Sequence, residues 1–230
     1  MAKILLTSPD LGIASRPYQG FTYCGDQAAS WLGDDGRVGL ALADGLGHGR
    51  DAEEAARAAL LYLESHWEKE PETVFPGCDA SIAHTRGAAV ALAVVSADRS
   101  SLTFSGAGNI RIAFVGERIK NFVVTPGIVG SGHLRVRSET MRLNPFSCIV
   151  MFTDGIQSRI NLLKCSSSLF EDMRRLASTI VCDWGRKDDD VGVVAWRCKI
   201  DADKRNAETQ SIESDDKNIL PLKPEAIVKE

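Results

Sequence analysis

Four short stretches of the sequence lie far apart in the chain. In each of them, an aspartate stands at the end of a strand-like run. They are Cys24-Gly25-Asp26-Gln27, Ala43-Asp44-Gly45, Thr153-Asp154-Gly155 and Asp188-Asp189-Asp190. Carboxylates that converged from four separate strand ends would repel one another strongly in a site of reduced dielectric. A hard divalent cation removes that repulsion, and oxygen-only ligands favour Mg²⁺ or Mn²⁺ over zinc. The pattern therefore predicts a two-metal hydrolase that acts on phosphate esters.

Asp44 is the sharpest candidate ligand. It follows the apolar run VGLALA at residues 38–43, which is typical of a buried strand. Gly45, next in the chain, leaves room for its backbone carbonyl to act as a further oxygen ligand. An isolated Asp-Gly pair would more simply cap the helix that follows. The three other matching aspartates favour the metal site instead.

Other residues near these motifs carry weaker signals. His48, in the glycine-rich turn, could donate a proton to a leaving serine oxygen or could simply face solvent. Asp190 could be a metal ligand or an acceptor that orients one. Arg16 and Arg86 could contact phosphate, although Arg86 precedes a buried strand and could equally make a structural hydrogen bond.

Composition narrows the class of protein. The chain has 230 residues, a formal charge of −4 and no run of Lys or Arg, which argues against nucleic-acid binding. The longest apolar run, residues 88–95, is far too short for a membrane span. Six cysteines without C-x-x-C pairs are expected to be reduced and buried, and no signal peptide is apparent in residues 1–9. We therefore expect a cytoplasmic protein.

The spacing of the hydrophobic residues predicts the helices and strands that position these motifs. Residues 51–64 carry an alanine-rich stripe at helical spacing, and residues 169–181 predict a second helix. Strands are expected at residues 38–43, 88–95, 102–105, 109–115, 119–124, 148–152 and 191–196. Short links between several of them favour antiparallel pairing. Residues 66–76, polar and with two prolines, are expected to be a connection. This block-wise order predicts an α+β fold.

The chain divides after residue 200. Residues 1–200 are expected to form one domain, whereas residues 201–230 are rich in Asp, Glu, Lys, Ser and Asn. Such a segment has too little apolar surface to offset its ordering entropy, so a mobile tail is expected.

The motifs, taken in order, resemble the SpoIIE-type branch of the PP2C-like serine/threonine phosphatases. The matching stretches are CGDQ, ADGLGHG with the alanine-rich helix, TRGAA at residues 85–89, GAGN at 106–109, GIVG at 127–130, TDG and DDDVGVV. The resemblance runs from about Arg16 to Trp196, and the single-domain build is similar to phosphatases of the stressosome pathway. It implies an α/β/β/α sandwich of two antiparallel sheets between helices.

The same resemblance implies roles for individual residues. Asp44 would bridge two Mn²⁺ or Mg²⁺ ions, Gly45 would contribute its carbonyl oxygen, and Asp154 and Asp189 would bind opposite, with Asp26 acting directly or through water. Water held between the ions would attack the phosphoryl group in line, without a phosphorylated enzyme. An arginine that grips phosphate in eukaryotic relatives would fall near Phe21 and is absent.

Two functions remain open at this point. The first is a metal-dependent phosphatase whose substrates, by resemblance, are phosphorylated STAS-domain regulators of a stressosome or partner-switching pathway. The second is a catalytically weak, phosphatase-like binding module, whose signature would be loss of a metal aspartate. All four aspartates are present. A nucleotide-binding loop at Gly45–Gly49 is disfavoured because it lacks the Lys-Ser/Thr ending of a P-loop.

Overall fold

The computed structural model describes residues 8–116, 119–132, 134–145 and 147–199; the predicted tail, residues 201–230, lies outside them. The strands are β1 (Leu11–Arg16), β2 (Asp26–Leu32), β3 (Val38–Gly45), β4 (Ala88–Val95), β5 (Ser101–Ala107), β6 (Arg111–Val115), β7 (Ile119–Val123), β8 (Glu139–Arg142), β9 (Cys148–Phe152) and β10 (Val191–Arg197). The helices are α1 (Arg50–Glu64), α2 (Pro71–Ser81) and α3 (Met173–Trp184), with short 3₁₀ turns at Leu162–Lys164 and Ser167–Glu171.

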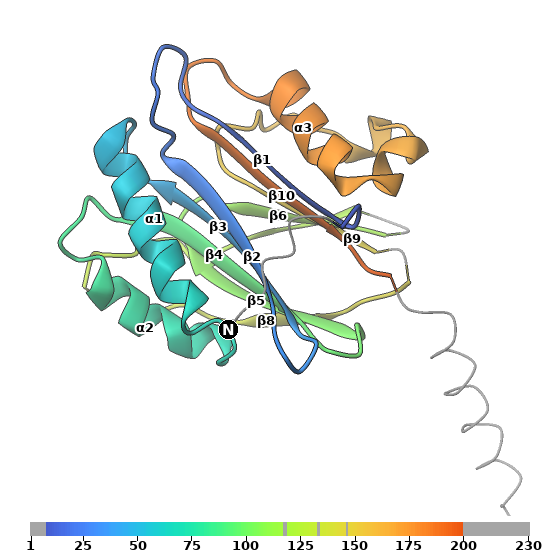
Figure 1. Ribbon diagram of the computed structural model, residues 1–230, viewed down its shortest axis with the longest axis horizontal. Coiled ribbons are helices and arrows are strands. Elements are labelled where there is room, and N and C mark those ends of the chain that lie inside the picture. Colours follow the sequence, from blue (N-terminus) through green and yellow to red (C-terminus); the bar gives the residue numbers. More distant parts are fainter. Residues whose placement is uncertain (1–7, 117–118, 133, 146, 200–230) are drawn as a thin grey trace, which may run out of the picture. The chain divides into compact units, whose positions relative to one another are not determined.

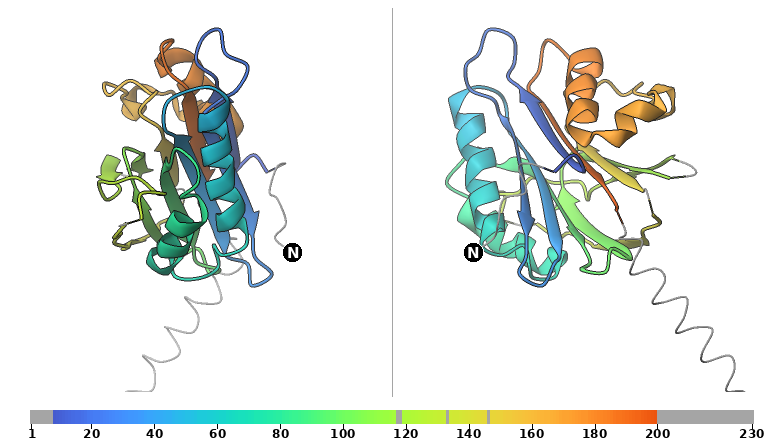
Figure 2. Two further views of the ribbon diagram at one scale, coloured as in Figure 1. Left: turned by 90° about the vertical axis from the view of Figure 1, so that its left-hand side faces the viewer. Right: turned by 45° about the vertical axis from the view of Figure 1, so that its right-hand side comes forward.

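Two five-stranded antiparallel sheets form the centre of the fold, with orders β2-β3-β4-β5-β8 and β1-β10-β9-β6-β7. Helices α1 and α2 cover the outer face of the first sheet, and α3 covers the outer face of the second (Figures 1 and 2). The predicted α+β sandwich is therefore confirmed.

Successive side chains of each central strand point to opposite faces of its sheet, so each strand contributes to two interfaces. In β3, Ala41 and Ala43 pack among the residues beneath α1 and α2. In β10, Val193 and Ala195 pack among those beneath α3. Gly192 faces the other way, because a Cβ built there would lie 3.0 Å from the Leu42 side chain of the opposite sheet. The space between the sheets is filled from both sides.

Helix α1 packs unusually close to the strand that precedes it. Its alanine stripe (Ala52, Ala55, Ala56 and Ala59) is fully buried, as the helical spacing predicts. A Cβ added at Gly45 would lie 1.9 Å from the carbonyl oxygen of Ala52, so only glycine fits at that position. Small residues on both elements thus bring the start of α1 against the end of β3.

The expectation that residues 66–76 form a connection is wrong, because helix α2 begins at Pro71. Proline suits the first helical position, where its missing N–H would have no partner and its φ is already helical. Pro76 lies inside the helix but does not break it. Burial of Val74, Phe75 and Cys78 against the first sheet outweighs the poor helix propensity of the segment.

Other elements also depart from expectation. The strands expected at residues 102–105 and 109–115 do not pair despite their short link, since β5 and β6 lie in different sheets. Strands β1, β2 and β8 were not predicted. The helix expected at residues 169–181 is a 3₁₀ turn followed by α3, which begins where the Asp172 side chain accepts from the Arg174 N–H at 2.9 Å. Cys182 is exposed rather than buried.

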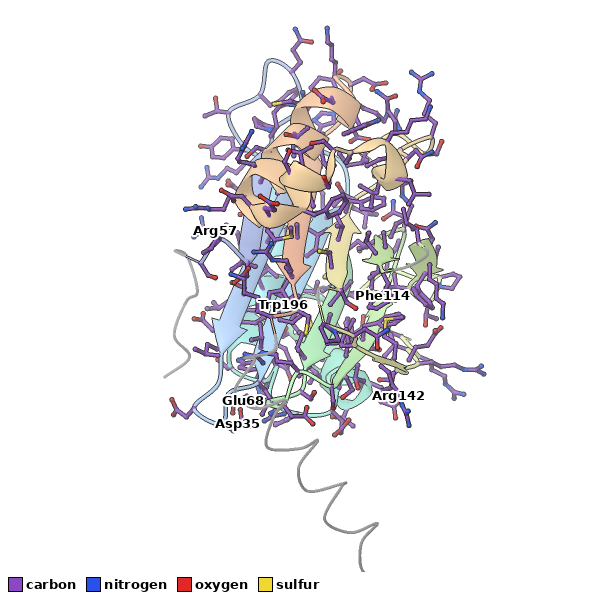
Figure 3. The ribbon with its side chains drawn as sticks, turned by 90° about the vertical axis from the view of Figure 1, so that its right-hand side faces the viewer. Asp35, Arg57, Glu68, Phe114, Arg142 and Trp196 are labelled. Atoms are coloured by element: carbon purple, nitrogen blue, oxygen red, sulfur yellow. The ribbon has the colours of Figure 1, made fainter. Side chains whose placement is uncertain are left out.

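Figure 3 labels several residues toward the end of the sandwich at which β3 and β5 begin. Phe114 and Trp196 are buried among the strands, with exposed fractions of 9% and 5%. Asp35 lies in the turn that joins β2 to β3, and Arg142 lies on β8, opposite the start of β5. This end is remote from Asp26 and Asp44, which occupy the other end of the β2–β3 pair. Substitutions here can serve as controls for the site.

Candidate active site

The aspartate motifs meet at one edge because the strands that carry them are antiparallel. Asp26 and Asp44 are directly opposite each other in the β2–β3 ladder. Asp154 follows β9, and Asp189 precedes β10, which pairs antiparallel with β9. The expectation that every aspartate ends a strand is therefore wrong for Asp26, which begins β2, and for Asp189. Two strand ends and two strand starts produce the same convergence.

A cavity of about 510 Å³ lies at this edge. Its walls include Asp44, Asp154 and Asp189, together with His48 of the glycine-rich turn. The remaining lining comes from Tyr18, Leu46, Gly47, Ala89, Gly108, Asn109, Pro126, Gly127, Ile128 and Asp188. Four carboxylates, from three parts of the chain, thus share one concave, solvent-accessible space with a histidine.

Asp26 lies beneath this cavity and is held from the second sheet. Its side chain is 1% exposed, and its Oδ2 accepts a hydrogen bond of 2.6 Å from Thr153 Oγ1. The Gly192 N–H donates in turn to Thr153 Oγ1 at 3.0 Å. Burial and the nearby Asp44 carboxylate raise the pKa of Asp26 well above its usual value, which the Thr153 hydrogen bond opposes. A bound cation nearby would favour the ionised form of this buried carboxyl.

Asp44 is the electrostatic centre of the site. Burial, followed by the charges of Asp154 and Asp189, raises the pKa of Asp44 from 3.8 to about 7. A hydrogen bond with Asp26 lowers it in part. The charges of Asp154 and Asp189 disfavour ionisation of Asp44, so a cation would favour the fully ionised cluster.

Asp154 and Asp189 each have a partner that fixes the carboxylate. Asn109 Nδ2, just before β6, donates to Asp154 Oδ2 at 2.7 Å. Arg186 Nη1 lies 3.8 Å from Asp189 Oδ2. Burial, and then the charge of Asp154, raise the pKa of Asp189, while Arg186 lowers it. These partners aim the two carboxylates without filling all of their acceptor sites.

The Asp190 side chain contacts the loop that precedes β2. Its Oδ1 accepts from the Tyr18 N–H at 2.8 Å, and its buried Oδ2 has no hydrogen-bond partner among the described residues. A Cβ built at Gly25 would lie 2.9 Å from that Oδ2 and 3.5 Å from the Gly45 carbonyl oxygen. An unsatisfied carboxylate oxygen and a backbone carbonyl therefore border a space that any side chain at position 25 would fill.

His48 lies on the rim of the cavity against two aromatic rings. Its ring centroid is 5.4 Å from that of Tyr18 and 4.7 Å from that of Phe21. The positive φ of Gly47 and Gly49, 86° and 81°, shapes the turn that presents it. The imidazole is exposed and faces the same space as the carboxylates.

The two arginines proposed as phosphate contacts are engaged elsewhere. Arg16 Nη2 donates to the Arg186 carbonyl oxygen at 2.5 Å, which ties β1 to the loop before β10. Arg86 Nη2 forms an exposed ion pair of 2.6 Å with Asp51 in the first turn of α1. Both contacts fasten loops around the site, so a structural role accounts for each arginine as it stands.

The donor set fits a hard divalent cation. Among the described residues, no three His, Cys, Asp or Glu side chains form a ready-made metal-binding group. Mg²⁺ does not require one, since it usually keeps several waters and takes only one or two carboxylates. The raised pKa of Asp44 and the unsatisfied Asp190 oxygen are both features that a bound cation would relieve. All of the candidate donors are oxygens.

Several residues that shape the site were not singled out from sequence. Thr153 and Asn109 stand inside the TDG and GAGN motifs, but nothing in the sequence shows which carboxylate each would contact. Asp79 on α2 accepts from the Gly130 N–H at 2.5 Å and so anchors the loop that carries Gly127 and Ile128 into the cavity. Each contact joins segments remote in sequence, for which a local pattern gives no signal.

The sandwich and its carboxylate-lined cavity define a PP2C-type serine/threonine protein phosphatase, a metal-dependent class. The chain belongs to the family described as Stage II sporulation protein E (SpoIIE), whose model matches residues 34–199. The phosphoserine phosphatase RsbX of Bacillus subtilis (strain 168) is 24% identical over 140 residues, which cover 60% of this chain and 70% of RsbX.

Solved structures agree with this assignment. A chain from a structure described as the bacterial stressosome, a modular system adapted to control secondary messenger signaling, has a TM-score of 0.75 and 29% identity. That match covers 81% of this chain and 97% of the other. RsbX in complex with magnesium has a TM-score of 0.70, 20% identity and coverage of 86% and 100%, and at that identity it supports the fold alone.

Among the described residues, no helix has both the length and the apolar character that a membrane span requires. The predicted cytoplasmic location stays a prediction.

Proposed function

We propose that this protein removes phosphate from phosphoserine or phosphothreonine on small STAS-domain regulators of a stressosome or partner-switching pathway. The observation that carries the proposal is the convergence of Asp44, Asp154 and Asp189 on one cavity, above the buried Asp26. The similarity to RsbX and to a stressosome-related chain supports the pathway. The alternative, a binding module without turnover, is disfavoured because all four aspartates are retained.

Two Mn²⁺ or Mg²⁺ ions are the cofactors that this cluster fits. Asp44, the Gly45 carbonyl oxygen, Asp154 and Asp189 would hold them, with Asp26 and Asp190 contributing from the buried side of the site. When bound, the ions supply charge neutralisation for the phosphoryl group and a water acidic enough to attack it at neutral pH. Metal removal is therefore expected to abolish turnover.

The protein's own groups hold this arrangement and manage protons. Thr153 orients Asp26, and Asn109 orients Asp154. His48, exposed on the rim and facing the same cavity, is positioned to donate a proton to the leaving serine or threonine oxygen. The buried Asp190 Oδ2, which has no hydrogen-bond partner among the described residues, is left for a cation.

The test uses the purified full chain with p-nitrophenyl phosphate and with a phosphorylated STAS-domain protein. Activity with Mn²⁺, its loss in EDTA and its loss in Asp44→Ala and Asp154→Ala variants are expected. Asp34→Ala, a change in the exposed β2–β3 turn, is the matched control and should retain activity. Full activity without divalent metal would contradict the mechanism, whereas hydrolysis of the small substrate alone would contradict the proposed STAS substrate.

A further inference from the structure

A second cavity adjoins the carboxylate site and has the opposite electrostatic character. Its volume is about 500 Å³, and Asn109 and Asp154 line both cavities. The rest of its lining comes from Arg111, Ile156, Gln157, Ser158, Arg159 and Arg186. Three guanidinium groups thus face a space in which Asp154 is the single lining carboxylate, and Asp154 is itself a proposed metal ligand.

The three arginines are held to different degrees. Arg111 donates to the Ile156 carbonyl oxygen and lies 4.4 Å from the centre of the Phe152 ring, so it forms a fixed wall. Arg186 forms ion pairs with Asp188, at 3.2 Å, and with Asp189. Arg159 is exposed and donates to the Gln157 side chain at 2.9 Å. In the part of the chain that the structure describes, no carboxylate lies within ion-pair distance of Arg159.

Guanidinium groups arranged around a pocket match the geometry of oxyanions. Arginine presents planar, paired N–H donors that suit carboxylate and phosphate oxygens. Such contacts stay strong where part of the guanidinium is desolvated, as it is for Arg111 over the Phe152 ring. Neutralisation of Asp154 by a bound cation would leave the pocket more positive still.

We infer that the pocket formed by Arg111, Arg159 and Arg186 binds a second anionic group of the phosphoprotein substrate, close to the phosphoserine or phosphothreonine that is hydrolysed. The inference rests on the proposed function, because the phosphoryl group must occupy the adjoining cavity. In an extended peptide, side chains two residues apart project from the same face about 6.6 Å apart. We assign the second anion, a carboxylate or a second phosphate, to the residue two positions before or after the target, because that residue shares a face of the peptide with the target.

The test uses the full-length, Mn²⁺-loaded enzyme and phosphoserine peptides that differ at one position, two residues before or after the target. That position carries alanine, glutamate or phosphoserine. A KM lower by about fivefold for an anionic peptide than for the alanine peptide, with kcat little changed, is expected. Glutamate and phosphoserine peptides distinguish a carboxylate from a phosphate ligand.

Variants distinguish binding in the pocket from general electrostatic attraction to the protein. Arg159→Ala should reduce the discrimination between anionic and alanine peptides to near unity, and Arg159→Lys should restore it in part. Arg142→Ala, an equal loss of charge on exposed β8 at the far end of the sandwich, should leave the discrimination intact (Figure 3). Wild-type enzyme without discrimination at either position, or discrimination that survives in Arg159→Ala, would overturn the inference.

Binding without turnover distinguishes failure of this inference from failure of the proposed function. Fluorescently labelled versions of the same peptides are titrated into the Asp44→Asn variant, with anisotropy as the readout. Tighter binding of the anionic peptide, lost on adding Arg159→Ala, supports the pocket even if no peptide is hydrolysed. Equal binding of all peptides contradicts the pocket even if p-nitrophenyl phosphate is hydrolysed.

Discussion

Asp26 and Asp44 face each other across the β2–β3 ladder, and Thr153 of the other sheet donates to Asp26. This relationship joins the two sheets at the site and places two carboxylates where neither is freely solvated. Their pKa values are raised because burial and mutual repulsion disfavour the charged forms. The fold therefore carries an electrostatic cost at the position where a cation would be bound.

Asp44→Asn is expected to stabilise the metal-free protein near neutral pH. The substitution removes a carboxylate whose ionisation is opposed by its surroundings, so the free energy of unfolding in EDTA should rise by about 2 kcal/mol. The same variant should lose most of the stabilisation that Mn²⁺ gives the wild type. Chemical denaturation with and without metal measures both effects, and Asp34→Asn is the control. A less stable Asp44→Asn protein in EDTA would contradict the electrostatic account.

The pH dependence follows from the same group. Because the pKa of Asp44 is raised from 3.8 to about 7, the folded state holds this proton more tightly than the unfolded state. The contribution of Asp44 to stability is thus fully present below about pH 4 and is lost as pH rises toward about 7. The stability difference between Asp44→Asn and wild type, both in EDTA, should grow across this window. Mn²⁺ affinity should fall as pH drops below about 7, since binding displaces the proton.

Asn109→Ala should weaken metal binding through Asp154. The 2.7 Å hydrogen bond orients that carboxylate, and loss of such a partner typically lowers metal affinity by roughly tenfold. Calorimetric titration with Mn²⁺ measures the effect, and activity at saturating metal shows whether kcat also falls. Asn121→Ala, on exposed β7, is the control. Unchanged affinity in Asn109→Ala would show that the contact does not position Asp154.

Asp79→Ala should affect the catalytic cavity through the loop that Asp79 anchors. The Asp79 carboxylate is 5% exposed and accepts from the half-buried Gly130 N–H, so its removal leaves that donor without its partner at a cost of about 1–3 kcal/mol. The loop with Gly127 and Ile128 should then be less ordered, which raises KM more than it lowers kcat. Thermal unfolding and steady-state kinetics measure these changes, with Asp183→Ala on α3 as the control. An altered stability with an unchanged KM would restrict Asp79 to a structural role.

The sequence predicts the elements whose signals are local. Helix α1 was predicted from its alanine stripe, and β4 and β9 from continuous apolar runs bounded by turn residues. Helix α2 was missed because its prolines and glycine mask a helix that is stabilised by burial. Strand β2 was missed because DQAASWL has little of the alternation or β-branched content that marks a strand.

The candidate site likewise has a part that the sequence predicts and a part that it does not. The four aspartates were found because each stands beside a glycine or within an acidic turn at the end of a strand-like run. The partners that orient them could not be found, since Thr153 lies 127 positions from Asp26 and Asn109 lies 45 positions from Asp154. Such contacts depend on how two sheets pack, which a single sequence does not specify locally.

The central claim is that Asp44 holds cations together with Asp154 and Asp189. The most direct measurement is anomalous X-ray scattering from crystals of the full chain grown with Mn²⁺. Two manganese peaks are predicted in the cavity, each roughly 2.0–2.6 Å from a carboxylate oxygen of the cluster, with Asp44 touching both. Manganese bound elsewhere, with the cavity empty at saturating Mn²⁺ and neutral pH, would contradict the account.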